Sequence, residues 1–272
     1  MGGSDAVTPE SARADRVAIR LEDVHVTYRV YEQRHVKMKD LVTRGLKRRR
    51  YRSIHAVRGV TLDVCRGEIL GVVGSNGAGK STLLRALFGL LPVRSGSVSL
   101  QGEDVTNLAP DHLVKRGISY VPQVDNVFPS LTILENLQMG AFIRHDGAAE
   151  RVEHVLELFP DLAGRRGEIA GRLSGGQRQM LALARALMLD PSVLLLDEPS
   201  ASLSPKMVDI IFDRIKAINA GGTAMLLVEQ NAREALALSH RGYVLAMGIN
   251  RLEGEAQGLL ENEEVGRLYL GA

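Results

Sequence analysis

The chain has 272 residues, 45% hydrophobic and 24% charged with a formal net charge of +2, so it can bury a substantial core and is expected to be globular. Its single cysteine, Cys65, excludes an intramolecular disulfide, a four-cysteine zinc site and an all-cysteine iron–sulfur cluster, and favours a reducing compartment. No apolar run approaches the roughly 18 residues that a spanning helix needs, so the chain is not expected to cross a bilayer alone.

The start of the chain predicts a tail, a strand and a charged insert. Residues 1–16 are polar, lack the apolar centre of a secretory signal and are expected to form a disordered tail. The next stretch, "VAIRLEDVHVTY", predicts a strand. It leads into a basic insert, residues 30–55, where Arg34 to Arg52 holds nine Lys and Arg against one acidic residue, Asp40. A short helix in this insert would have an apolar side made by Val36, Met38, Leu41, Val42 and Leu46.

The rest of the chain alternates apolar runs with helical patterns. Strands are predicted at "IHAVRGVTLDV", "EILGVVG" and "GSVSLQG", and a helix follows Gly79. Residues 124–172 predict a helical subdomain, with patterns such as "TILENLQMGAF". Helix and buried strand then alternate from "QRQMLALARALML" to "TAMLLVEQ", which is typical of a parallel sheet. Because no internal repeat is visible, residues 17–272 are interpreted as one α/β domain.

A glycine-rich stretch, "GSNGAGKS", lies between a predicted strand and a predicted helix. Its glycines let backbone N–H groups surround a phosphate without Cβ clashes, and the helix N-terminus adds about half a positive charge. The pattern predicts a nucleoside triphosphate site, with Lys80 on the β- and γ-phosphates and Ser81 on Mg²⁺; the alternative is an ordinary glycine turn. The expected nucleotide contacts are Gly74, Ser75, Asn76, Gly77, Ala78, Gly79, Lys80, Ser81 and Thr82.

Two carboxylates end the buried strand pattern "SVLLLDE". Asp197 suits the coordination shell of Mg²⁺, and Glu198 is placed to act as the general base on an attacking water. General base catalysis contributes roughly 10² to 10⁴ in rate. A solvated strand end before a turn, which Pro199 would also favour, is the alternative.

The stretch "LSGGQRQ" places a serine and two glycines at the start of a predicted helix. A serine-capped helix would explain this stretch alone, but not its occurrence beside the other two motifs. With them, the sequence from Val17 to its end resembles the ABC ATPase family, whose signature is LSGGQ. The resemblance implies an α/β P-loop NTPase core with a mostly parallel sheet, an antiparallel β subdomain and a helical subdomain, and it implies binding of ATP with Mg²⁺.

The resemblance also implies roles for residues outside the glycine-rich loop. Gln123 in "SYVPQVDN" matches the glutamine that contacts Mg²⁺ and relays to a transmembrane partner, and Tyr28 in "VTYRVY" matches the aromatic that stacks on adenine. A loop amide and a half-buried strand tyrosine are the alternatives. In the family, the signature of one subunit closes over the γ-phosphate held by the other. The signature residues in this chain are Ser174, Gly175, Gly176 and Gln177.

Two positions depart from the general family pattern. Gln230 replaces the switch histidine, and Ser204 replaces the aspartate expected after "SASL". Gln230 is assigned to the catalytic site because its amide can hydrogen-bond a γ-phosphate, although it cannot carry positive charge. The intact Glu198 favours an active ATPase over the alternative of a non-catalytic, nucleotide-gated scaffold.

The two parts of the chain resemble different subfamilies. From about Phe88 onward, stretches such as "GISYVPQVDNVFPSLTILENLQMGAF" and "LLVEQNAREALALSHRGYVL" resemble the second ATPase subunit of branched-chain amino-acid importers, which share both departures. Residues 17–87 resemble the ATPases that export teichoic acid or O-antigen polysaccharide. The importer is favoured because the helical subdomain and the Gln123 loop, which bind the permease in this family, lie in the importer-like part.

The expected partners follow from these resemblances. Transmembrane permease subunits and a second ATPase subunit are implied, the latter non-identical in an importer, with a solute-binding protein, and identical in an exporter. The chain is then expected to be peripheral, at the cytoplasmic face of the cell membrane. The basic insert would face anionic lipid or form a solvated loop, and nucleic-acid binding is disfavoured because only Tyr51 is interleaved with its charges.

Overall fold

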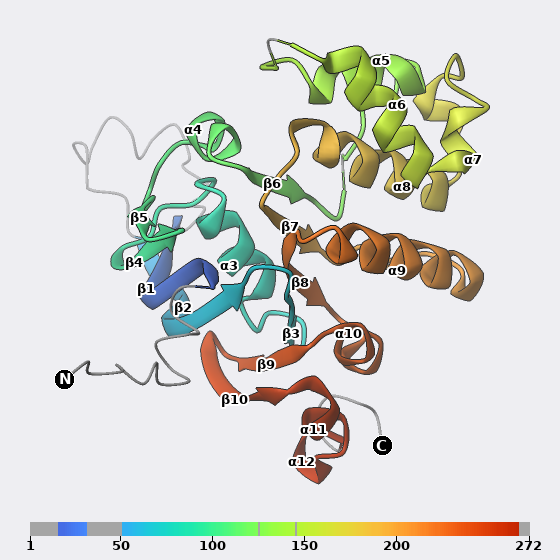
Figure 1. Ribbon diagram of the computed structural model, residues 1–272. Helices are drawn as coiled ribbons and strands as arrows, with labels where there is room; N and C mark the ends of the chain where they lie inside the picture. Colours follow the sequence, from blue (N-terminus) through green and yellow to red (C-terminus); the bar gives the residue numbers. More distant parts are fainter. Residues whose placement is uncertain (1–15, 32–50, 125, 145, 267–272) are drawn as a thin grey trace, which may run out of the picture.

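The computed structural model describes residues 16–31, 51–124, 126–144 and 146–266, and its strands form two sheets (Figure 1). The antiparallel sheet contains β1 (Val17–Tyr31), β2 (Tyr51–Cys65), β4 (Ser95–Leu100) and β5 (Glu103–Asp104), in the order β2-β1-β4-β5. The second sheet contains β3 (Ile69–Val73), β6 (Ile118–Val121), β7 (Val193–Asp197), β8 (Ala224–Glu229), β9 (Arg241–Ala246) and β10 (Ile249–Glu255). Its order is β10-β9-β3-β8-β7-β6, and all neighbours are parallel except β10 with β9.

Helices cover the second sheet and form a separate lobe. The helices are α3 (Lys80–Leu87), α4 (Pro110–Lys115), α5 (Ile133–Gly140), α6 (Ala148–Leu158), α7 (Pro160–Ala163), α8 (Gly175–Ala186), α9 (Pro205–Ala220), α10 (Ala232–Leu238), α11 (Ala256–Leu260) and α12 (Glu263–Val265), with short 3₁₀ turns η1 (Ala170–Arg172) and η2 (Leu187–Leu189). In Figure 1, α5 to α8 gather in one lobe, away from the antiparallel sheet. Within the described ranges, no helix is long and apolar enough to cross a membrane.

The central strands divide two hydrophobic cores. Every residue of β3, β7 and β8 is buried, as expected for a parallel sheet covered on both faces. Because successive side chains of a strand point to opposite faces, neighbouring residues enter different cores. Leu195 packs in the core shared with the antiparallel sheet and α3, whereas Leu196 packs in the core shared with the helical lobe.

The parallel pairing brings three strand ends to one edge of the sheet. Val73 at the end of β3 is in register with Glu229 at the end of β8, and Asp197 at the end of β7 pairs with Val228. Loops that follow these strands therefore leave the sheet side by side. This edge carries the candidate site.

The predicted α/β class, the mostly parallel sheet and the antiparallel subdomain are confirmed. The insert predicted at 30–55 needs a correction at both ends, because β1 continues through Tyr31, paired with Tyr51, and β2 runs from Tyr51. The strand pairs thus leave only residues 32–50 between them. Those residues, including the suggested short helix, and residues 1–15 lie outside the described part of the chain.

Two further elements differ from the sequence-based expectation. The helical lobe does not end at residue 172, because α8 packs against α5 and α6 in a common core. A C-terminal hairpin, β9 with β10, adds an antiparallel edge to the parallel sheet. Every residue of β10 is exposed or half-buried, so the stretch "INRLEGE" has no apolar run that would predict a strand.

Candidate functional site

The glycine-rich loop turns sharply between β3 and α3. Gly74, Gly77 and Gly79 have positive φ angles of 156°, 77° and 104°. A Cβ on Gly74 would collide with the Leu245 carbonyl oxygen, and one on Gly79 with the Ala56 carbonyl oxygen. Helix α3 has no side-chain cap, so the N–H groups of its first turn are not satisfied by a capping side chain. Bare N–H groups at a helix start form a ready anion site.

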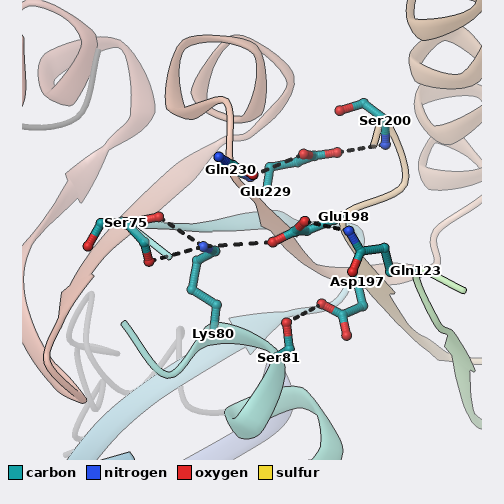
Figure 2. Close-up of polar contacts among 10 residues, drawn as sticks. Ser75, Lys80, Ser81, Gln123, Asp197, Glu198, Ser200, Glu229 and Gln230 are labelled. Carbon is teal, nitrogen blue, oxygen red and sulfur yellow. Dashed lines mark hydrogen bonds and ion pairs between the residues drawn. The ribbon is translucent and has the colours of Figure 1, made fainter. Parts of the chain in front are cut away.

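Lys80 lies at the centre of this loop. Its side chain is 4% exposed, and its Nζ donates to the carbonyl oxygens of Gly74 at 2.8 Å and Ser75 at 3.5 Å. The ammonium is 3.9 Å from a carboxylate oxygen of Glu198 (Figure 2). Burial lowers the pKa of Lys80, and the nearby carboxylates of Glu198 and Asp197 oppose that shift. A cation held only by carbonyls and one long ion pair is available to a phosphate.

Ser81 and Asp197 meet although 116 residues separate them. The Ser81 hydroxyl donates to Asp197 Oδ1 at 2.8 Å, and the Tyr120 hydroxyl donates to Asp197 Oδ2 at 2.9 Å. Burial raises the pKa of Tyr120 to about 12, and the Asp197 charge adds to the shift. Tyr120 therefore stays a donor and fixes the Asp197 carboxylate. No motif in the sequence indicates this role for Tyr120.

Glu198 leaves β7 in an unusual backbone conformation. Its φ is 48°, in the left-handed region that non-glycine residues rarely occupy, and its N–H donates to the Val228 carbonyl at 2.8 Å. Its carboxylate accepts from Gln123 Nε2 at 2.8 Å. The structure thus brings together Lys80, Glu198 and Gln123, which the sequence analysis singled out in three separate motifs.

A second buried glutamate lies beside Glu198 and was missed by the sequence analysis. Glu229 is 2% exposed and accepts from the backbone N–H groups of Ser200 at 2.8 Å and Gln230 at 3.2 Å (Figure 2). Burial raises its pKa to about 7, and the neighbouring Glu198 charge contributes to the shift. The available signal was a charged residue ending the apolar run "AMLLVE".

Tyr28 lies on β1, and Gln230 directly follows β8. The Tyr28 hydroxyl is 3.2 Å from the Thr82 hydroxyl in the first turn of α3, which places the ring beside the glycine-rich loop. Gln230 follows β8 and has an exposed side chain near Glu198 (Figure 2).

The signature residues form a capping box at the start of α8. The Ser174 N–H donates to Gln177 Oε1 at 2.9 Å, and the Gln177 N–H donates to the Ser174 hydroxyl at 3.3 Å. Gly176 is buried, and a Cβ there would collide with the Met207 side chain. No hydrogen bond or ion pair among the described residues joins this box to the glycine-rich loop.

The chain matches one protein family and is similar to several curated transport proteins. The family model described as ABC transporter matches residues 57–201. The probable branched-chain amino acid transport ATP-binding protein LivF of Archaeoglobus fulgidus is 45% identical over 223 residues, which cover 81% of this chain and 94% of that protein. BraG of Pseudomonas aeruginosa, a high-affinity branched-chain amino acid transport ATP-binding protein, is 43% identical, covering 81% and 95%. The lipopolysaccharide export system ATP-binding protein LptB of Escherichia coli is 35% identical, covering 81% and 93%.

Solved structures share the fold. An ATP-binding cassette of an ABC transporter in its ADP conformation superposes with a TM-score of 0.76 at 26% identity, covering 94% of this chain and 99% of that one. A second cassette, in a dimeric post-hydrolysis state bound to ADP and Pi, gives a TM-score of 0.72 at 26% identity and covers 88% and 98%.

Proposed function

Because this chain belongs to the ABC transporter family, we propose that it is the ATP-hydrolysing subunit of a transporter that imports branched-chain amino acids. The observation that carries the proposal is the convergence of Lys80, Asp197 and Glu198 at the glycine-rich loop. One cation and two carboxylates at an anion site are the groups that phosphoryl transfer to water requires.

The glycine-rich loop and Lys80 are proposed to bind the phosphates of ATP. Backbone N–H groups of residues 74–82 would surround the β-phosphate, and Lys80 would exchange its carbonyl partners for β- and γ-phosphate oxygens. That exchange also weakens the long ion pair of Lys80 with Glu198. Tyr28, held beside Thr82, is proposed to stack on the adenine.

Mg²⁺ is proposed to bind between Ser81 and Asp197, with Gln123 as a further ligand. The donor set fits, because Mg²⁺ prefers oxygen ligands and is commonly held by one or two carboxylates together with substrate phosphates. The ion would neutralise charge on the phosphates during transfer.

Glu198 is the proposed general base. It accepts a proton from a water whose oxygen attacks the γ-phosphorus, while the bond from that phosphorus to the bridging oxygen breaks and ADP leaves. The Gln230 amide is proposed to donate to a γ-phosphate oxygen, and the N–H groups and Ser174 hydroxyl of a second subunit would close the site. A dimer is supported by the likeness to the dimeric cassette with ADP and Pi.

The test of the base is Glu198→Gln in the transporter complex. The amide keeps the shape of the side chain but cannot accept the proton, so we expect the ATP hydrolysis rate to fall by about 10² to 10⁴ with nucleotide binding retained. Glu261→Gln, in an exposed carboxylate after α11, is the control. A Glu198→Gln protein that hydrolyses ATP at the wild-type rate would show that another group is the base.

The importer assignment has one rival with support of its own. The two importer relatives are 45% and 43% identical, but the lipopolysaccharide export protein is also similar, at 35%. An importer of this type would contain a non-identical ATPase mate and a solute-binding protein, whereas an exporter would contain two copies of this chain. Mass spectrometry of the complex purified from membranes separates these compositions.

The permease is proposed to dock on the helical lobe near Gln123. Of the eight large hydrophobic side chains that are exposed in the described ranges, four fall within residues 124–142: Val124, Phe128, Met139 and Phe142. Phe142 is 80% exposed. An exposed apolar group of this kind marks an interaction surface, and here it directly follows the Gln123 loop. Docking there would keep the chain at the cytoplasmic face of the membrane.

A further inference from the structure

The strand β8 ends in a carboxylate that packing does not require. The five residues before Glu229, from Ala224 to Val228, are apolar and buried. Burying a carboxylate is costly unless its oxygens are hydrogen-bonded, and an apolar residue would continue the pattern without that cost. Glu229 nevertheless lies in the core, at 2% exposure.

Both carboxylate oxygens of Glu229 accept hydrogen bonds, one from the loop after β7 and one from the loop after β8. Oε1 accepts from the Ser200 N–H at 2.8 Å, in the loop after Glu198, and Oε2 accepts from the N–H of Gln230 at 3.2 Å. The same two segments are joined once more, because the Glu198 N–H donates to the Val228 carbonyl at 2.8 Å. The segment with the proposed base and the segment with Gln230 are thus cross-linked at two points, and Figure 2 draws the one between Ser200 and Glu229.

We propose that Glu229 is a positioning residue that holds the loop of Glu198 and the loop of Gln230 in register at the γ-phosphate end of the site. The inference rests on the proposed ATP-hydrolysing function. Only a carboxylate accepts on both oxygens, so it can hold two N–H groups at once. A glutamine offers one acceptor and one donor and would release one of the loops.

If Glu229 had a purely structural role, its replacement would lower kcat only as far as it lowers stability. Glu68 supplies the matched control. Glu68 is also a buried glutamate, 8% exposed, that accepts from a backbone N–H, that of Cys65 at 2.7 Å, and from Arg241 at 3.0 Å. It precedes β3, at the opposite end of the strands from the glycine-rich loop. Loss of this carboxylate disturbs the core but not the two loops of the site.

The experiment measures kcat for ATP, nucleotide affinity and thermal stability for Glu229→Gln, Glu229→Ala, Glu68→Gln and the wild type, each as the full chain in its transporter complex. We expect kcat to fall in the order wild type, Gln, Ala, with a loss of about 10- to 100-fold for Ala, because small displacements of reacting groups have effects of this size. Nucleotide affinity should stay within about twofold, since the glycine-rich loop supplies the binding. Glu68→Gln should lower stability without lowering kcat.

Two results would overturn the inference. One is wild-type kcat in Glu229→Ala; the other is an equal kcat loss in Glu68→Gln at equal loss of stability, which would make the effect structural. If Glu229→Ala does not fold, the same comparison is made with Glu229→Gln. Absence of ATP hydrolysis in the wild-type complex would contradict the proposed function itself and remove the basis of this inference with it.

Discussion

Lys80 is poised to change partners rather than to stabilise the fold. Its ammonium is almost fully buried, yet its hydrogen bonds go to two carbonyls of its own loop and its nearest carboxylate oxygen is 3.9 Å away. Burial accordingly lowers the pKa of Lys80. A phosphate would give this cation stronger, charge-assisted hydrogen bonds than the carbonyls do.

Replacing Lys80 tests that exchange. We expect Lys80→Met to weaken ATP binding by about 10- to 100-fold, because a hydrogen bond to a charged group contributes about 1.5 to 3 kcal/mol. Lys206→Met, at an exposed position in the first turn of α9, should bind ATP as the wild type does. Isothermal titration measures both, and unchanged affinity in Lys80→Met would remove the lysine from the phosphate site.

Glu229 should make stability depend on pH in a defined direction. Its pKa in the folded protein is about 7, above its ordinary value of 4.5, because burial disfavours the charged form more than its hydrogen bonds stabilise it. The contribution of this group to the free energy of unfolding is therefore complete below pH 4.5 and is lost as the pH rises through about 7. The glutamine variant does not titrate and serves as the reference.

Denaturant unfolding of the wild type and Glu229→Gln at several pH values measures this dependence. The stability of the wild type relative to the variant should fall by about 3 kcal/mol between pH 4.5 and pH 8, since a shift of one pKa unit corresponds to about 1.4 kcal/mol. A difference that stays constant or grows with pH would show that burial does not raise this pKa.

Two helices of the lobe, α5 and α8, begin with the same kind of capping box, but only the box of α8 is expected to take part in ATP hydrolysis. Ser174 caps α8 with Gln177, and Thr132 caps α5 with Glu135. In each box the hydroxyl accepts from the third N–H of the helix and the longer side chain accepts in return. The boxes are equivalent for helix stability, and only the first belongs to the proposed signature.

Removing each hydroxyl separates capping from function. Ser174→Ala and Thr132→Ala should each lower the free energy of unfolding by about 0.5 to 2 kcal/mol. Only Ser174→Ala should also reduce ATP hydrolysis, because its hydroxyl is proposed to reach the phosphate of the second subunit. Chemical denaturation and a steady-state ATPase assay test the pair, and equal ATPase rates in the two variants would contradict the signature assignment.

At the scale of the whole molecule, the site and the apolar surface of the lobe lie in connected segments. Gln123, which hydrogen-bonds Glu198, comes two residues after β6 and directly before the exposed Val124. Asn126 then donates to Gln179 of α8 at 2.6 Å, so the same segment also contacts the helix that begins at Ser174. A permease bound at this surface would act on both halves of the proposed site.

Phe142 offers a direct test of that surface. Its ring is 80% exposed, so Phe142→Ser should leave stability and ATP affinity unchanged, because little of it is buried in the chain itself. We expect the variant to lose co-purification with the permease. Met247→Ser, an equally apolar position that is 66% exposed outside the lobe, is the control. Retention of the permease by Phe142→Ser would place the docking surface elsewhere.

The parts of the fold predicted from sequence are those with local signals. The loop of Gly74, Gly77 and Gly79 was predicted because positive φ favours glycine at all three positions, and close backbone approach favours it also at Gly74 and Gly79. Strands β7 and β8 were predicted from short apolar runs, because both of their faces are buried. The edge strand β10 was missed because its side chains are half-buried or exposed. The extension of β1 past Tyr28 was missed because it is defined by pairing with β2, a contact between distant parts of the chain.

The sequence by itself determined the glycine-rich loop after β3 and the pair of carboxylates, Asp197 and Glu198, at the end of β7. Each of these motifs is contiguous, and its chemistry depends on neighbouring residues. Only the tertiary structure decided that Tyr120 holds Asp197 and that Glu229 joins the loops of Glu198 and Gln230. The physical reason is the parallel sheet. It sets the ends of distant strands beside one another, so contacts between their loops depend on strand order and register, which no single stretch of the chain contains.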